Sequence, residues 1–110
     1  MIAKTPGAPY YAVIFTSVRT EVDDGYEEMS QRMEELASTY PGFIGFEAAR
    51  KDIGIFISYW KDLDSIKNWK ADSEHLDAQK KGYDKWYSHF RVRIAKIERE
   101  YGFDKEYPVS

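Results

Sequence analysis

The stretch from Ser58 to Trp86 holds the side chains of this chain that are best suited to chemistry. All three tryptophans and one of the two histidines lie within it. His75 can take a proton from a ligand at neutral pH, because imidazole titrates close to that range. Trp69 offers a flat face on which an aromatic ring can stack. We therefore interpret His75 and Trp69 as candidate catalytic residues for proton removal from a bound aromatic compound.

Removal of that proton leaves an anion, which needs a positively charged or hydrogen-bonding partner. Arg91, in the strand-like segment that follows, is the candidate for this role if its side chain points inward, and Arg93 is the alternative. Other aromatic side chains can hold the ligand flat, and we predict three substrate-binding residues of this kind: Trp60, Tyr83 and Trp86.

Each of these residues also has a purely structural interpretation. Phe, Tyr and Trp make up 16% of the chain, and in a small domain such side chains mostly fill the core or an interface. His75 can equally be exposed or bound at the start of a helix, and the arginines can face solvent. From the sequence alone both interpretations stay open.

We expect neither a metal site nor a cofactor. Asp72, Glu74, His75 and Asp77 share one segment, but no second histidine stands four residues from His75, as a zinc-binding helix would require. The absence of cysteine removes thiolate ligands, disulfides and a cysteine nucleophile.

Charge and hydropathy limit the partners. The net charge of −3 is unlike the basic surface of a protein that binds phosphate backbones. The N-terminal residues lack the apolar core of a signal peptide, and no segment approaches the roughly 20 apolar residues of a membrane span. We expect a cytoplasmic protein that binds neither nucleic acid nor membranes.

The first half of the chain predicts a strand and a helix. Residues 10–18 are rich in β-branched and aromatic side chains, which is typical of a strand. Asp24 and Glu27 have the spacing of a capping box at a helix start. Apolar side chains then recur at intervals of three and four, which places one stripe on an amphipathic helix that ends at Pro41 and Gly42; the stripe comprises Tyr26, Met29, Met33, Leu36 and Tyr40.

The second half predicts a hairpin, a broken helix and a last strand. Residues 43–50 and 53–60 are strand-like and are joined at Lys51 and Asp52. Asp62 or Asp64 can cap the next helix, a new cap follows at residues 72–73, and Gly82 bends or ends the second piece. Residues 89–101 form the last predicted strand. Its apolar side chains share one parity up to Ile94 and the other parity from Ala95 onward. This change indicates a bulge or two covered faces of the sheet.

This β-α-β-β-α-β order predicts an α+β domain with the ferredoxin-like arrangement, a four-stranded antiparallel sheet with its helices on one face. The domain spans residues 10–101, between a flexible arm at residues 1–9 and a tail at residues 102–110. Large apolar side chains lie on both faces of the predicted sheet. We expect a second copy of the chain to cover the open sheet face in a homodimer.

Three short sequences in this order resemble the antibiotic biosynthesis monooxygenase superfamily. They are Tyr-Pro-Gly-Phe-Ile-Gly-Phe-Glu at residues 40–47, Ser-Tyr-Trp at residues 58–60 and Glu-His-Leu at residues 74–76. The resemblance implies a dimeric α+β barrel and a cavity between each sheet and its own helices. It also implies oxidation of a small aromatic or quinol-type substrate by O₂ without a metal or flavin, or a non-catalytic ligand-binding or stress-response module on the same fold.

Some members of this superfamily degrade haem with a first-strand Asn, a Trp on the second helix and a His ten residues after that Trp. Trp69 matches the Trp, but Gln79 occupies the histidine position, and the first strand offers Thr16 and Ser17 rather than Asn. Glutamine is a poor ligand for haem iron. Haem binding therefore ranks third, after a cofactor-independent monooxygenase and a binding module.

Overall fold

Four strands form a single antiparallel sheet in the order β2-β3-β1-β4. The protein was analysed as a computed structural model that describes residues 2–105. Strand β1 spans Tyr10–Arg19 and lies between β3 (Gly54–Trp60) and β4 (Tyr87–Ile97). Strand β2 (Phe43–Arg50) forms the other edge of the sheet.

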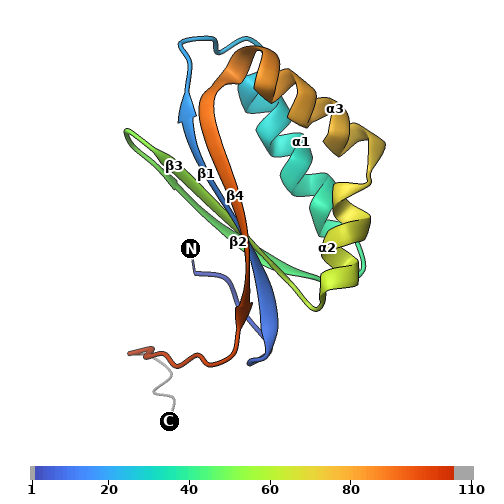
Figure 1. Cartoon of the computed structure of the whole chain (residues 1–110). Helices are drawn as coiled ribbons and strands as arrows, with labels where there is room; N and C mark the ends of the chain where they lie inside the picture. The colour runs from blue at the N-terminus through green and yellow to red at the C-terminus, as the bar shows by residue number, and fades with distance from the viewer. Residues whose placement is uncertain (1, 106–110) are drawn as a thin grey trace.

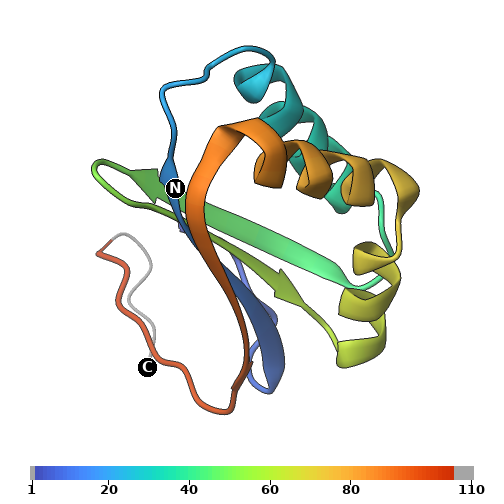
Figure 2. The same ribbon diagram turned by 45° about the horizontal axis from the view of Figure 1, so that its top comes forward.

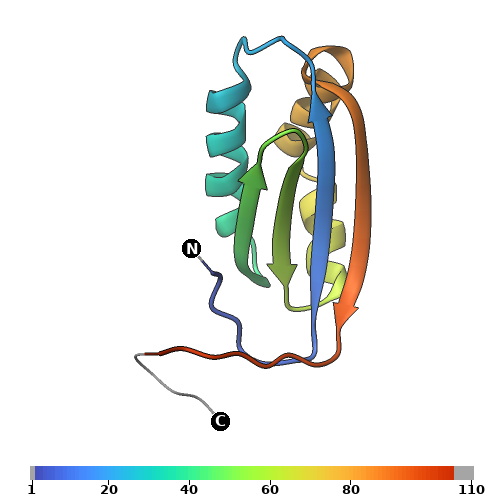
Figure 3. The ribbon, with the colours of Figure 1, turned by 90° about the vertical axis from the view of Figure 1, so that its left-hand side faces the viewer.

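The helices all lie on one face of this sheet (Figure 1). Helix α1 spans Tyr26–Ser38, α2 spans Leu63–Lys70 and α3 spans Ser73–Lys81. A π-helical turn, η1 (Gly82–Trp86), follows α3 directly. Figure 2 shows α1 and α3 side by side above the sheet, and Figure 3 shows that none of the helices within residues 2–105 covers the opposite face. The predicted ferredoxin-like α+β fold is therefore confirmed, with the second helix split as expected.

The three predicted helix starts are confirmed, but one predicted cap is wrong. Asp62 accepts a hydrogen bond from the Ser65 amide at 2.8 Å at the start of α2, and Asp72 caps α3 in the same way. Helix α1 instead begins after Gly25, which has φ 76°, and it has no side-chain cap. The capping box fails because the chain turns at Gly25, where the Asp24 carbonyl accepts a 2.9 Å hydrogen bond from the Trp86 indole.

Strand β4 was predicted at residues 89–101, and both of these ends are wrong. The strand begins at Tyr87, which pairs with Arg19, and ends at Ile97. Two explanations were predicted for the change of parity at Ile94–Ala95, a bulge or two covered faces. The bulge is wrong, because the pairing with β1 runs through these residues without interruption and shifts only at Val18/Arg19. The hydrophobic phase changes there because β4 carries apolar side chains on both faces.

The core lies between the sheet and the helices. Its buried cluster consists of Ala37, Trp60, Ile66 and Trp69. The predicted apolar stripe of α1 packs against this cluster through Met33, Leu36 and Tyr40, while β1 contributes Tyr11 and Val13. Since alternate strand residues point to opposite faces, every residue of β1 in the parity of Val13 faces the helices. We call this the helix face of the sheet.

The segments before β1 and after β4 meet beside the sheet. Residues 2–9 contain no helix or strand, but the amide of Ala3 donates a 2.9 Å hydrogen bond to the Glu47 carboxylate. Beyond β4, Glu100 accepts hydrogen bonds from the hydroxyl groups of Thr5 and Tyr10. The chain segments on both sides of the domain are thus hydrogen-bonded to it and to each other.

Gly42, in the turn before β2, provides a stability prediction. It has φ 88°, and an added Cβ would lie 2.6 Å from Ser65 Cβ and closer still to its hydroxyl. Gly25 has φ 76°, but a Cβ there would only make an ordinary 3.6 Å contact with Trp86. Gly25→Ala should cost about 1 kcal/mol for the left-handed backbone alone. We expect Gly42→Ala to cost clearly more, because the steric clash adds to the same strain.

Urea unfolding of the two alanine variants measures this difference. If Gly42→Ala and Gly25→Ala lose equal free energy of unfolding, the turn at Gly42 can move away from Ser65 without an energetic cost.

Candidate functional site

Trp60, Trp69 and His75 form one continuous aromatic stack beside α2. The rings of Trp60 and Trp69 lie 6.3 Å apart at 23°, and those of Trp69 and His75 lie 4.2 Å apart at 11°. Trp60 is fully buried and Trp69 is 8% exposed. The two tryptophans are therefore core residues, and His75 continues their stack toward the junction of α2 and α3.

His75 is held in one orientation by its backbone and its ring. Its amide donates a 2.9 Å hydrogen bond to Asp72, and its Nδ1 lies 3.1 Å from the carbonyl oxygen of Trp69. A carbonyl can only accept, so Nδ1 carries the hydrogen in the neutral ring. Burial lowers the pKa of His75 below 6.5, and the charge of Lys70 acts in the same direction. The ring is therefore neutral at pH 7, with Nε2 as its proton acceptor.

Tyr40 secures this junction from the end of α1. Its hydroxyl donates to the second carboxylate oxygen of Asp72, and its ring meets Trp69 edge-on at 5.3 Å. The hydrogen bond from Tyr40, followed by that from the His75 amide, lowers the pKa of Asp72 below 3.8. Asp72 therefore stays ionised near neutral pH and connects α1 to the start of α3.

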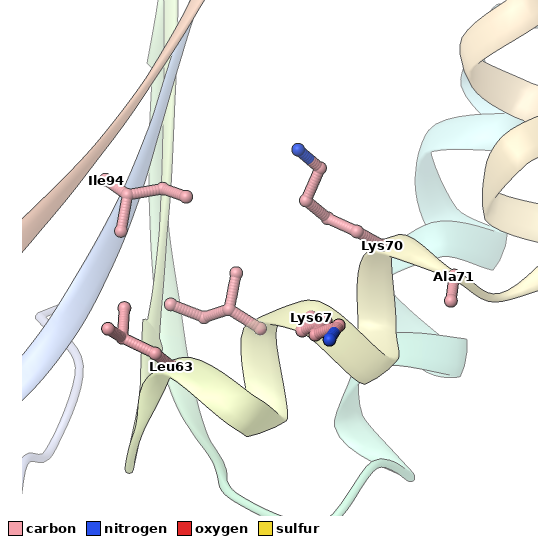
Figure 4. A pocket seen from close by; sticks show the side chains of 6 residues that line it. Leu63, Lys67, Lys70, Ala71 and Ile94 are labelled. Atoms are coloured by element: carbon pink, nitrogen blue, oxygen red, sulfur yellow. The ribbon is translucent and has the colours of Figure 1, made fainter.

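A cavity of about 390 Å³ lies between α2 and β4 (Figure 4). Ile94 of β4 and Leu63 of α2 point toward one another across it, and the side chain of Lys70 extends along it. Its complete lining is Leu63, Ile66, Lys67, Lys70, Ala71 and Ile94. The cavity is thus apolar with two ammonium groups, and it lies between the sheet and the helices, where the family resemblance implies one.

An exposed strip of β4 begins at Ile94, the one residue of this strand among those that line the cavity. Phe90, Val92 and Ile94 pair with Ser17, Phe15 and Val13 of β1 and so lie on the helix face. Although this face is the core side of the sheet, Val92 is 39% exposed and Ile94 is 47% exposed. The helices leave this edge of the sheet open, so a flat ligand can lie against it.

The structure does not bring Arg91 to the aromatic stack. Arg91 pairs with Thr16, and Arg93 pairs with Ile14. Both partners have the opposite parity to Val13, so the two arginines lie on the open face, across the sheet from Trp69 and His75. Arg91 was a candidate on the condition that its side chain points inward, and the pairing of β4 with β1 places it on the open face instead.

Tyr83 and Trp86 belong to a second aromatic group at the other end of the helix layer. Trp86 is 2% exposed, and its ring meets that of Tyr26 edge-on at 6.0 Å. Tyr83 is 70% exposed and lies 5.0 Å from the ring of Phe90. Neither residue lines the cavity between α2 and β4. They remain candidate binding residues only at the far end of the β4 strip.

Two positively charged groups near the helix face were missed in the sequence. Lys70 was not considered because exposed helical lysines carry no local signal. Arg50 was overlooked because it ends a hairpin strand, yet it hydrogen-bonds the buried Ser17 of β1 at 2.6 Å. This contact follows only from strand pairing, in which Gly54 of β3 lies between Arg50 of β2 and Ser17 of β1.

Residues 2–105 contain no group of three or more His, Cys, Asp or Glu side chains arranged to hold a metal ion. Within the same range, every helix is too short or too polar to cross a bilayer.

Comparisons with known proteins agree with the fold. The family model for antibiotic biosynthesis monooxygenase matches residues 9–81. The chain is 46% identical over 101 residues to YqjZ, an uncharacterized protein of Bacillus subtilis (strain 168), with 90% of this chain and 89% of that protein covered.

Solved structures with the same fold are more distant in sequence. SnoaB, a cofactor-independent oxygenase from Streptomyces nogalater, superposes with a TM-score of 0.72 at 14% identity, covering 84% of this chain and 97% of SnoaB. Rv0793 from Mycobacterium tuberculosis superposes with a TM-score of 0.74 at 9% identity, covering 86% and 100% of the two chains. At these identities the likeness concerns the fold alone.

Proposed function

The chain belongs to the antibiotic biosynthesis monooxygenase family, and from that membership we propose that it oxidises a small aromatic or quinol-type compound with O₂. The observation that carries this proposal is the apolar cavity between α2 and β4, together with the neutral, oriented imidazole of His75, which stacks on Trp69, the α2 residue before the cavity-lining Lys70. The resemblance in fold to a cofactor-independent oxygenase supports it.

Binding and deprotonation use different parts of the site. The ligand ring lies against Ile66 and Ile94, where apolar contact excludes water. His75 takes up a proton at Nε2, since Nδ1–H is committed to the Trp69 carbonyl. The ammonium group of Lys70, rather than Arg91, stabilises the resulting anion, because Lys70 lines the cavity and its charge also acts on His75.

The substrate itself supplies the electrons for this reaction. In an anthrone-type substrate a CH₂ group becomes a carbonyl: one atom of O₂ enters the carbon, and the other leaves as water with the two hydrogens. The deprotonated ring is the electron-rich species that reacts with O₂. The protein therefore contributes orientation, proton uptake and charge stabilisation.

Oxygen consumption tests the proposal. The purified protein, with a panel of hydroquinones and anthrone, should consume one O₂ per substrate oxidised and release no hydrogen peroxide. A rate at the uncatalysed background across the whole panel would contradict a monooxygenase.

A non-catalytic ligand-binding module is the second candidate. It is favoured by the observation that neither His75 nor Trp69 is itself among the residues that line the cavity. Saturable binding of an aromatic compound without O₂ consumption would support this candidate. Haem degradation stays third, because Gln79 occupies the position of the family's iron ligand; an unchanged absorbance spectrum on adding haem would remove it.

We also propose that the protein is a homodimer through the open face of the sheet. This face presents Ile14, Ile55 and Ile57 side by side on β1 and β3, and Ile55 is 39% exposed. Sedimentation at micromolar concentration should give a dimer, and Ile55→Lys should give a monomer because it places a charge within the interface. Leu76→Lys, at a 50% exposed position on α3, should remain dimeric. A monomeric wild type would contradict this assembly.

A further inference from the structure

Arg50, Gly54 and Ser17 form a row across three strands at the hairpin end of the sheet. Gly54 pairs with Arg50 on one side and with Ser17 on the other. Ser17 has the parity of Val13, so all three residues lie on the helix face. The next residue in this row is Phe90 of β4, which pairs with Ser17 and lies at the far end of the exposed strip.

The absence of a side chain at Gly54 lets Arg50 cross β3. A Cβ on Gly54 would lie 2.6 Å from Arg50 Nε and closer still to its Cζ and Nη2. The arginine therefore lies flat over this glycine, and its Nη2 donates a 2.6 Å hydrogen bond to the Ser17 hydroxyl. Ser17 is 1% exposed, so this contact fixes the guanidinium against a buried and immobile group.

The guanidinium group of Arg50 keeps most of its donors for other partners. No carboxylate within residues 2–105 forms an ion pair with it. An arginine fork carries five N–H donors, and only one hydrogen bond, to Ser17, engages it in this part of the chain. By contrast, Arg19 and Arg32 each pair with a carboxylate.

Aromatic rings surround this end of the strip. Phe90 lies 5.2 Å from Phe15 and 5.9 Å from Tyr87. Tyr87 is close enough to feel the charge of Arg50: burial raises the pKa of its phenol, while Arg50 and Arg19 act against that rise. A fixed cation next to a flat apolar surface is the arrangement that recognises an aromatic acid.

We propose that Arg50, positioned by Ser17 across Gly54, is an anion-recognition site that selects aromatic ligands bearing a carboxylate. The ring system would lie along Phe90, Val92 and Ile94, while the carboxylate would meet the guanidinium group. Four residues along a strand correspond to about 13 Å, the scale of a three-ring aromatic acid. This inference rests on the proposed function, because it places the ligand along the same exposed strip of β4. It adds that the substrate is an aromatic carboxylic acid.

Two matched fluorescent probes test the site: anthracene-2-carboxylate and the uncharged anthracene-2-carboxamide. The wild type should bind the carboxylate about tenfold more tightly, the effect of roughly 1.4 kcal/mol from a charge-assisted hydrogen bond. Arg50→Gln should abolish this preference and leave carboxamide affinity unchanged. Gly54→Ala should do the same without removing any charge, because the new Cβ displaces the guanidinium from Ser17.

Arg99→Gln is the matched control, since it removes the same charge at an exposed position beyond β4, and it should keep the preference. Three results would overturn the inference: no preference or no binding in the wild type, a preference that survives in Arg50→Gln or Gly54→Ala, or an equal loss of affinity for both probes in Arg50→Gln. An Arg50-dependent preference in a protein that consumes no O₂ would uphold the site and refute the monooxygenase.

Discussion

Replacing Trp60 with alanine is expected to lower the free energy of unfolding by about 3–5 kcal/mol, the range for deleting a large aromatic side chain from a core. Trp60 is fully buried and is the centre of the cluster between sheet and helices. Its ring meets Phe43 edge-on at 5.3 Å and stacks on Trp69. Its indole N–H also donates a 2.9 Å hydrogen bond to Ser58. Alanine would remove all of these contacts and leave a cavity.

Such a loss is a large part of the roughly 5–15 kcal/mol that stabilises a typical domain. Urea unfolding at one fixed protein concentration measures it, because dimer formation would make the midpoint depend on concentration. Leu76→Ala, at a half-exposed position on α3, is the control and should change stability by about 0.5 kcal/mol. Equal effects of the two substitutions would mean that Trp60 is not the centre of the core.

The largest functional effect is expected from His75→Ala, which should lower kcat for O₂ consumption by about 10²–10⁴-fold, the usual contribution of a general base. The alanine variant has no group at the position of Nε2 to take the substrate proton. Substrate affinity should change little, because the apolar side chains of the cavity, rather than the imidazole, hold the substrate ring. His89→Ala, at an exposed position on β4, is the matched control and should keep the wild-type kcat.

The pH dependence of the wild type separates a base from a structural histidine. A base acts in its neutral form, so activity should level off at higher pH and fall toward acid pH as the imidazole becomes protonated. Burial lowers the pKa of His75, so the half-point of this fall should lie below 6.5. The acid limb should be absent in His75→Gln. If that variant keeps both the rate and the limb, His75 is not the base.

Local sequence signals predicted the elements well where one residue type alone determines the backbone. Asp62 and Asp72 cap helices because the carboxylate of each accepts a hydrogen bond from the backbone amide three residues later. This contact depends only on local sequence. Gly82 ends α3 because it costs helix stability and admits the close approach of Tyr87. The capping box of α1 was wrongly predicted since the carbonyl of Asp24 is bound by Trp86, which lies 62 residues later.

The candidate site was predicted only in part, because strand register decides which face a side chain occupies. Trp60, Trp69 and His75 come together through consecutive elements, β3, α2 and α3, so their proximity follows from local order along the chain. Register places Arg91 on the open face and Arg50, which the sequence did not single out, on the helix face. A shift of one residue inverts this assignment, and nothing in the local sequence of β4 reveals the shift.

The central position of β1 has a consequence for synthesis on the ribosome. By the time residue 60 has emerged, β1 can pair with β3 and β3 with β2, which gives three strands of the final sheet. The other edge of β1 has to wait for β4, whose last paired residue is Ile97. Until then an apolar strand edge stays open to other chains. The pairing of β1 with β4, the least local in the sheet, is therefore the step at which folding and aggregation compete.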